Sequence, residues 1–143
     1  MPTDTLMTRD EVEAFLAEVF PQLLMDGPIY RVDSVGPLRA RMTMAISDRH
    51  LRPGGTVSGP SMMALADLVF YAAILANLGP VALAVTTNLS FNFMRKPEPR
   101  DLSAECRLFK LGKRLAVGEA LIFNQGSDAL VCHATGTYSV PPR

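Results

Sequence analysis

The 143-residue chain has little of what marks several large classes of protein. Its charges cancel, with 14 Lys and Arg against 14 Asp and Glu, so nothing indicates a nucleic-acid or membrane-surface partner. Its two cysteines, Cys106 and Cys132, are far apart and form no CxxC pair, so we expect buried thiols in a protein of the reducing cytoplasm. With only two histidines and no cysteine cluster, we expect no metal site, and nothing indicates a redox cofactor.

Targeting and multidomain features are also missing from the chain. The first 20 residues lack a basic region followed by an apolar core, so we expect no signal peptide. No repeat, linker or low-complexity tract interrupts the sequence, and 48% of the residues are hydrophobic. We therefore expect one globular domain over residues 1–143, located in the cytoplasm.

Charge is scarcest in the most apolar part of the chain. Between Arg52 and Arg95, Asp67 is the only charged residue. A continuous apolar helix is predicted around it, with Pro60 in its first turn and its end at Gly79–Pro80. The helix is near the short limit of a membrane span, but a lone carboxylate without a flanking basic anchor favours a buried core helix.

The rest of the sequence predicts one more helix and several strands. A capping box and an apolar stripe predict an amphipathic helix over residues 8–20, which ends before Pro21 and the turn at 26–28. Strict alternation predicts a half-buried strand over 38–47, with Leu38, Ala40, Met42, Met44 and Ile46 facing inward. β-Forming composition and turn residues predict further strands at about 29–35, 81–94, 101–112, 114–124 and 128–140. This order indicates an α+β fold, an antiparallel sheet around one central helix.

Asp67 is the first candidate for chemistry. A carboxylate that loses its water can act as a general base, or as a nucleophile toward an acyl carbon. The helix N-terminus offers free N–H groups, and Gly59 supplies one without side-chain bulk. Eight residues separate the two positions, about 12 Å along a helix axis. An elongated substrate, or a site shared across a dimer, would have to connect them.

A structural role for Asp67 is the alternative hypothesis. The carboxylate could simply pair with Arg52, Arg95 or a buried hydroxyl, since structural ion pairs also perturb carboxylates. In that case its replacement by Asn would change nothing beyond stability.

Three segments together resemble one known family. "HLRPGGTVSGPSMMALADLVF" at 50–70 is similar to the signature of the hotdog-fold thioesterases of the PaaI type. The likeness continues through "AVTTNLSFNFMRKP" at 84–97 and "KLGKRLAVGEALIFNQGSDALVCHATGTYSV" at 110–140. It covers residues 36–140 and implies the hotdog fold, a sheet wrapped around a long central helix.

The resemblance also implies an activity and an assembly. It implies hydrolysis of acyl-CoA thioesters, with an aromatic or a medium- or long-chain acyl group, and coenzyme A as part of the substrate. By position, Asp67 would be the base or nucleophile and the Gly59 N–H the oxyanion donor, while Thr86 or Thr87 would help to hold a water molecule. Family active sites lie at the interface of a homodimer, and a dimer of dimers is the expected assembly.

Three positions depart from the family pattern, which has Asn, His and Gly where this chain has Arg52, Ser58 and Pro60. Ser58 can still form hydrogen bonds but cannot act as an imidazole, and Arg52 could pair with Asp67 and quench it. These changes motivate an alternative function, a non-catalytic acyl or acyl-CoA binding protein. A hotdog dehydratase or hydratase is a further alternative, but the central helix lacks the histidine such enzymes use.

The candidate site residues follow from this resemblance. Those assigned to catalysis are Asp67, Gly59, Thr86 and Ser58. Those assigned to substrate binding are His50, Arg52, Pro60, Met63, Thr87, Asn88, Arg95, Lys113 and Arg114. For His50 the alternative is a residue that holds its turn, and for the basic residues it is ordinary surface charge.

Overall fold

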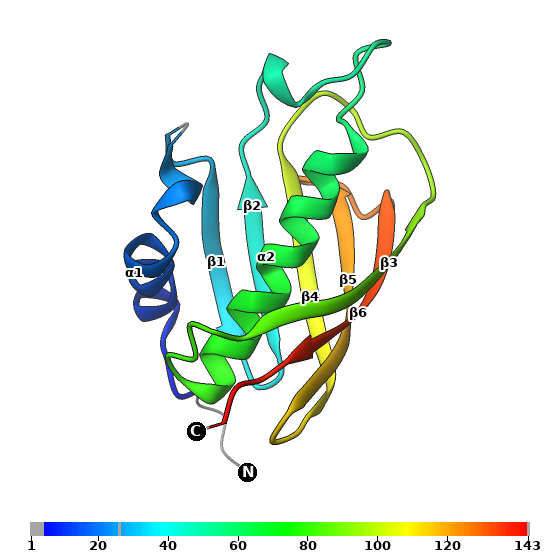
Figure 1. Ribbon diagram of the computed structural model, residues 1–143. Helices are drawn as coiled ribbons and strands as arrows, with labels where there is room; N and C mark the ends of the chain where they lie inside the picture. The colour runs from blue at the N-terminus through cyan, green and yellow to red at the C-terminus, as the bar shows by residue number, and fades with distance from the viewer. Residues whose placement is uncertain (1–4, 26, 143) are drawn as a thin grey trace.

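Six antiparallel strands curve around one long helix in the computed structural model, which describes residues 5–25 and 27–142 (Figure 1). The long helix is α2 (Gly59–Leu78). The strands are β1 (Tyr30–Gly36), β2 (Arg39–Met44), β3 (Val85–Phe93), β4 (Leu102–Leu111), β5 (Leu115–Asn124) and β6 (Cys132–Ser139). Their order in the sheet is β1-β2-β4-β5-β6-β3. The predicted α+β class and the hotdog arrangement are confirmed; Asp26 of the predicted turn lies outside the described residues.

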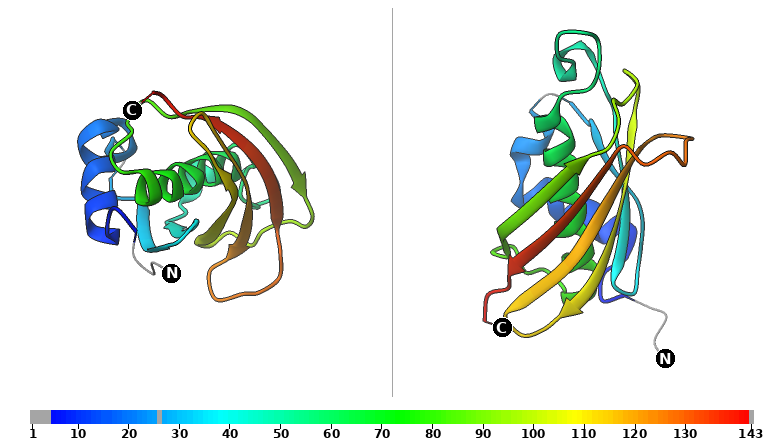
Figure 2. Two further views of the ribbon diagram at one scale, coloured as in Figure 1. Left: turned by 90° about the horizontal axis from the view of Figure 1, so that it is seen from below. Right: turned by 90° about the vertical axis from the view of Figure 1, so that its right-hand side faces the viewer.

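The core forms where the concave face of the sheet meets α2, as the end-on view shows (Figure 2). Period-two alternation buries Leu102, Ala104, Cys106 and Leu108 of β4, as predicted. Gly136 of β6 lets Phe70 of α2 approach the sheet, since a Cβ there would lie 3.1 Å from the phenyl Cζ. Both cysteines are free and buried, as predicted, and burial raises the pKa of Cys132 to about 11.

The long helix begins and ends where the sequence predicts. Ser58 is its N-cap, Pro60 lies in the first turn, and Gly79 closes its C-terminus with a positive φ of 91°. Among the described helices, α2 alone has the length and composition of a membrane span. In this fold 67% of its most apolar stretch is buried, as expected of a core helix.

The two edges of the sheet differ in how they are covered. Helix α1 (Arg9–Val19), with the predicted Thr8–Glu11 capping box, packs beside β1 (Figures 1 and 2). Arg9 Nε donates to the carbonyl of Val32, and the Val32 N–H donates to Glu13. Strand β3 forms the opposite edge, and seven of its nine residues are exposed. A long exposed edge strand is a template for pairing with another strand.

One strand prediction is wrong at its ends. Leu38 was predicted to face inward, but it lies in the β1–β2 turn at a φ of 59° and is 41% exposed. Ile46 lies beyond the end of β2 and is only partly buried. Thr43 keeps its predicted side, opposite that of Met42 and Met44, although it is buried, and its hydroxyl donates to Asp33 of the bulged strand β1. The tight turn at Leu38 and the end of β2 at Met44 limit the alternation to the residues between them.

Candidate active site

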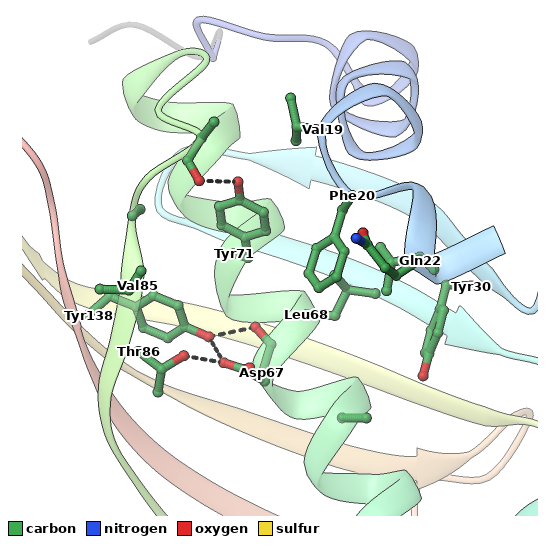
Figure 3. Close-up of a pocket in the computed structure, with 14 residues that line it drawn as sticks. Val19, Phe20, Gln22, Tyr30, Asp67, Leu68, Tyr71, Val85, Thr86 and Tyr138 are labelled. Atoms are coloured by element: carbon green, nitrogen blue, oxygen red, sulfur yellow. Dashed lines mark hydrogen bonds between the residues drawn. The ribbon is translucent and has the colours of Figure 1, made fainter. Parts of the chain in front are cut away.

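Asp67 opens into a pocket of about 500 Å³ between α2, β3 and the N-terminal segment (Figure 3). Its carboxylate is the only charged group among the described residues that line this pocket. Most of the others are apolar or aromatic: Val19, Phe20, Gln22, Leu23, Tyr30, Ala64, Leu68, Tyr71, Ala82, Ala84, Val85, Thr86 and Tyr138. We call this the acid pocket.

Two hydroxyls converge on one carboxylate oxygen of Asp67 (Figure 3). Thr86 Oγ1 donates to Asp67 Oδ1 at 2.5 Å, and the Tyr138 hydroxyl contacts the same Oδ1 and, at 2.6 Å, the backbone carbonyl of Asp67. Burial raises the pKa of Tyr138, and the negative charge of Asp67 raises it further, so the phenol stays protonated and can donate. Among the described residues no cation pairs with Asp67, and its Oδ2 has no hydrogen-bond partner.

A β-bulge decides which threonine faces the carboxylate. The register between β3 and β6 shifts between Thr86 and Asn88, so Thr87 is the extra residue. Leu89 and Phe91 face inward, because they pair with the buried Gly136 and Ala134 of β6. If the strand alternated without a break, Thr87 would face inward as well. The bulge instead pairs Thr86 with Tyr138, so both hydroxyls point at Asp67, while Thr87 donates to the carbonyl of Thr137.

Segments outside the core sheet complete the acid pocket. Phe20 and Val19, at the end of α1, line the pocket although they are 39% and 37% exposed. Tyr71, one turn beyond Asp67 on α2, donates to the Ala82 carbonyl at 2.8 Å, and burial raises its pKa. The walls of the pocket are mostly apolar. Its polar groups, among the described residues, are the Asp67 carboxylate, the Gln22 amide and the hydroxyls of Tyr30, Tyr71, Thr86 and Tyr138.

The first turn of α2 presents one open backbone donor. The Ser58 hydroxyl accepts from the Ser61 N–H at 3.3 Å and lies 2.9 Å from the Ser61 hydroxyl. Pro60 has no N–H and the Ser61 N–H is capped, so neither of these positions in the first turn offers a free donor. The Gly59 N–H has no hydrogen-bond partner within the part of the chain that the structure describes. It is therefore free to bind an external oxygen.

A second pocket, of about 380 Å³, lies at this end of α2. We call it the basic pocket, because the charged residues among its described lining are Arg52, Arg95 and Lys96; the others are Thr56, Val57, Gly59, Met62, Phe93, Met94 and Pro97. None of the three cations has an ion pair within the described residues, and all three are exposed. Gly59 and Asp67 thus line different pockets of the same chain.

Comparison with known proteins identifies the family. The model of the Thioesterase superfamily matches residues 54–131, which include both Gly59 and Asp67. The chain belongs to the thioesterase superfamily.

The chain is similar to proteins named as a thioesterase and an esterase, and to a further solved structure of the same fold. The crystal structure of "a putative thioesterase" from Silicibacter sp. TM1040 is 50% identical in sequence, with a TM-score of 0.87 over 98% of this chain and 96% of that one. "Putative esterase PA0474" of Pseudomonas aeruginosa is 28% identical over 87% of this chain and 96% of its own length. A mutant of the phenylacetic acid degradation protein PaaI from Thermus thermophilus shares the fold, at 24% identity and a TM-score of 0.71 over 85% of this chain and 99% of that one.

Several residues predicted for the site of this thioesterase-superfamily protein lie away from Asp67. His50 is buried, and its Nδ1 accepts from the Ser47 N–H, which holds the turn before α2. Met63 is 39% exposed and lines neither the acid pocket nor the basic pocket. Arg52 lines the basic pocket, so within one chain it does not quench Asp67.

The remaining predicted substrate contacts lie on exposed surfaces. Asn88 is exposed on the edge strand β3. Lys113 and Arg114 are exposed in the β4–β5 hairpin. Leu115, next to this hairpin, pairs with Ser139, and Ser139 in turn pairs with Val85, so the hairpin lies near the start of β3. Arg95 follows the other end of β3, so the two basic groups lie far apart in one chain (Figure 1).

Sequence reasoning missed Tyr138, the second hydroxyl on Asp67 of this superfamily member. A signal was present: alternation along β6 places Cys132, Ala134, Gly136 and Tyr138 on the same, buried face. A tyrosine on a core face needs a partner for its hydroxyl. Phe20 and Tyr30 were also missed, because they reach the pocket from elements outside the segment that resembles the family.

Proposed function

We propose that this member of the thioesterase superfamily hydrolyses acyl-CoA thioesters to a free acid and coenzyme A. One observation carries the proposal: among the described residues, Asp67 is the only charged group in an apolar pocket, and one of its carboxylate oxygens is bound by two hydroxyls while the other is open. An apolar wall suits an acyl group, and an anchored carboxylate suits attack on its carbonyl.

The proposed reaction uses only groups of the protein, the substrate and water. In the base mechanism, Asp67 takes a proton from water as the water oxygen bonds to the thioester carbon, and the carbonyl electron pair moves onto its oxygen. The Gly59 N–H stabilises that oxyanion. As the carbonyl re-forms, the carbon–sulfur bond breaks and the thiolate takes the proton back. If Asp67 is instead the nucleophile, water hydrolyses the resulting anhydride; the balance is the same.

The geometry of β3 explains how Gly59 and Asp67 can meet. The strand starts beside Asp67, where Thr86 bonds the carboxylate, and ends at Phe93, which a Cβ on Gly59 would contact at 3.8 Å. If two copies pair β3 with β3 in antiparallel fashion, the end of each strand lies opposite the start of the other. Each Asp67 then lies near the Gly59 of the partner subunit. We propose this homodimer as the active unit, with a dimer of dimers as a further level.

In the proposed pairing, the two ends of the substrate would bind to different chains. The acyl group would occupy the acid pocket of one chain, an aromatic or a medium- or long-chain group being compatible with about 500 Å³. The phosphates of coenzyme A would lie near Arg52, Arg95 and Lys96 of the other chain, since unpaired cations favour phosphate. The pairing also brings the hairpin with Lys113 and Arg114 of one chain toward Arg95 of the other.

Release of free thiol from a panel of acyl-CoA esters tests the proposal, with wild type beside Asp67→Asn. The amide of this variant would keep the shape of the side chain but could not take a proton or attack, so we expect turnover to fall by about a thousandfold or more. Circular dichroism checks that both proteins fold. Absence of turnover by the wild type on every ester, with acyl-CoA still bound, would favour the non-catalytic binding protein instead.

A further inference from the structure

We propose that Tyr138 is a positioning residue for Asp67: its hydroxyl, with that of Thr86, occupies Oδ1 and leaves Oδ2 as the oxygen that reacts. The inference rests on the proposed function and deepens it, because it assigns different roles to the two carboxylate oxygens. It holds whether Asp67 activates water or attacks the thioester itself.

The contacts of Tyr138 fix both the place and the rotation of the carboxylate. The phenol reaches from β6 to the backbone carbonyl of Asp67 at 2.6 Å and to Oδ1 of the same residue, so one hydroxyl spans the main chain and the side chain (Figure 3). Its ring stacks on Phe70 of α2, with centroids 5.6 Å apart, and is only 2% exposed. A donor held this firmly restricts the torsions of Asp67 more than a mobile water molecule could.

The same contact favours the ionised carboxylate. Hydrogen bonds to the charged form stabilise it, whereas burial and nearby negative charge oppose it. Besides Asp67, the titratable groups among the described residues that line the acid pocket are Tyr138 from β6, Tyr71 from α2 and Tyr30 from β1, and none of these lining residues is a cation. Tyr71 directs its hydroxyl to Ala82 instead of Asp67. Within the described residues, Tyr138 and Thr86 are therefore the groups that donate hydrogen bonds to the carboxylate of this half-buried side chain.

Substitution of each hydroxyl tests the assignment. In Tyr138→Phe we expect the acidic limb of the pH–kcat profile to move up by about one pH unit, because the ionised base loses a donor. Thr86→Val should move it in the same direction, and Thr86→Ser should restore it. Tyr71→Phe is the matched control, because it removes a hydroxyl from the same pocket that does not contact Asp67. The acidic limb of its pH–kcat profile should stay in place, whatever its turnover.

A second readout does not depend on turnover. The ¹³C carboxyl resonance of Asp67, assigned by its absence in Asp67→Asn, is titrated in each variant, and we expect the same order of midpoints. If Tyr138→Phe does not fold, 3-fluorotyrosine at position 138, a stronger donor of nearly the same shape, should move the midpoint to lower pH.

The outcomes separate the two proposals. An equal Asp67 midpoint in wild type and Tyr138→Phe, or no response to fluorotyrosine, overturns the role of Tyr138 even if the protein is a thioesterase. Shifted midpoints in a protein that hydrolyses no ester would retain the contact and overturn the proposed function.

Discussion

The first turn of α2 and its middle differ in almost every property that matters for chemistry. Within the described residues, the open N–H of Gly59 at the first turn lines a pocket with three cations that have no ion pair, and Asp67 in the middle is the only charge in an apolar pocket. One region can hold developing negative charge and phosphates, and the other can supply a base and hold an acyl chain. Each lacks what the other has, so in the proposed function each region contributes half of an active site, and the two regions lie about 12 Å apart on one helix.

Opposite charge makes the two regions complementary as well as different. The acid pocket carries one negative group and the basic pocket three positive ones, and β3 runs from the first to the second. An exposed edge strand that connects complementary pockets is suited to a two-fold pairing of chains. Variants of the first turn and of the middle of α2 show whether the two regions act together.

After Asp67→Asn, the largest effect is expected from removal of the Gly59 donor. Gly59→Pro removes the N–H at a position where proline suits the helix, since Ser58 before it is extended. We expect kcat to fall by about 10² to 10³-fold, the loss typical of an oxyanion donor. Gly59→Ala is the matched control: it keeps the N–H, and its Cβ makes only an ordinary contact at 3.8 Å with Phe93. Thiol release measures both variants.

Co-expression of two inactive variants shows whether the half-sites belong to different chains. In a mixed dimer of Gly59→Pro and Asp67→Asn, a shared site contains either both substitutions or neither. Random pairing would then restore about a quarter of wild-type activity, because half of the dimers carry one intact site of two. If Gly59 and Asp67 acted within one chain, every mixed site would keep one lesion, and no activity would return.

A smaller effect is expected from the cations of the basic pocket. Substitution of Arg52, Arg95 and Lys96 by Gln should raise KM for acyl-CoA by about tenfold and leave kcat nearly unchanged, because phosphate contacts bind ground and transition state alike. The KM of the variant should also depend less on salt. Arg39→Gln is the control, an exposed arginine that lines neither pocket. An equal KM in the triple variant and the wild type would contradict this assignment.

The sequence sufficed for the fold and for the isolation of Asp67. The α2 boundaries, the capping box at Thr8 and the inward face of β4 all depend on local signals, such as proline, glycine and period-two alternation, which the structure confirms. These signals act over a few residues and need no knowledge of distant contacts.

The partners of Asp67 were harder to predict because they depend on long-range register. A bulge of one residue in β3 decides between Thr86 and Thr87, and nothing local marks it. Tyr138 lies 71 positions from Asp67 in the sequence, and the two meet because the sheet that contains β6 curves around α2 (Figure 1). Leu38 shows the opposite failure: alternation placed it inward, and a turn with positive φ exposed it.

The smallest effect is expected at Ser58. The family resemblance assigned this residue to catalysis, and in the structure it is the N-cap of α2. Its hydroxyl accepts from the Ser61 N–H, so Ser58→Ala should lower the free energy of unfolding by about 1 kcal/mol, measured by urea denaturation at a fixed protein concentration. Ser58→Asp keeps a capping oxygen and should restore stability. The loss of kcat in Ser58→Ala should be smaller than in Gly59→Pro, because the Gly59 N–H remains. A large loss of kcat with unchanged stability would instead move Ser58 from the helix cap into the chemistry, and the first turn of α2 would then contribute a side chain as well as a backbone donor.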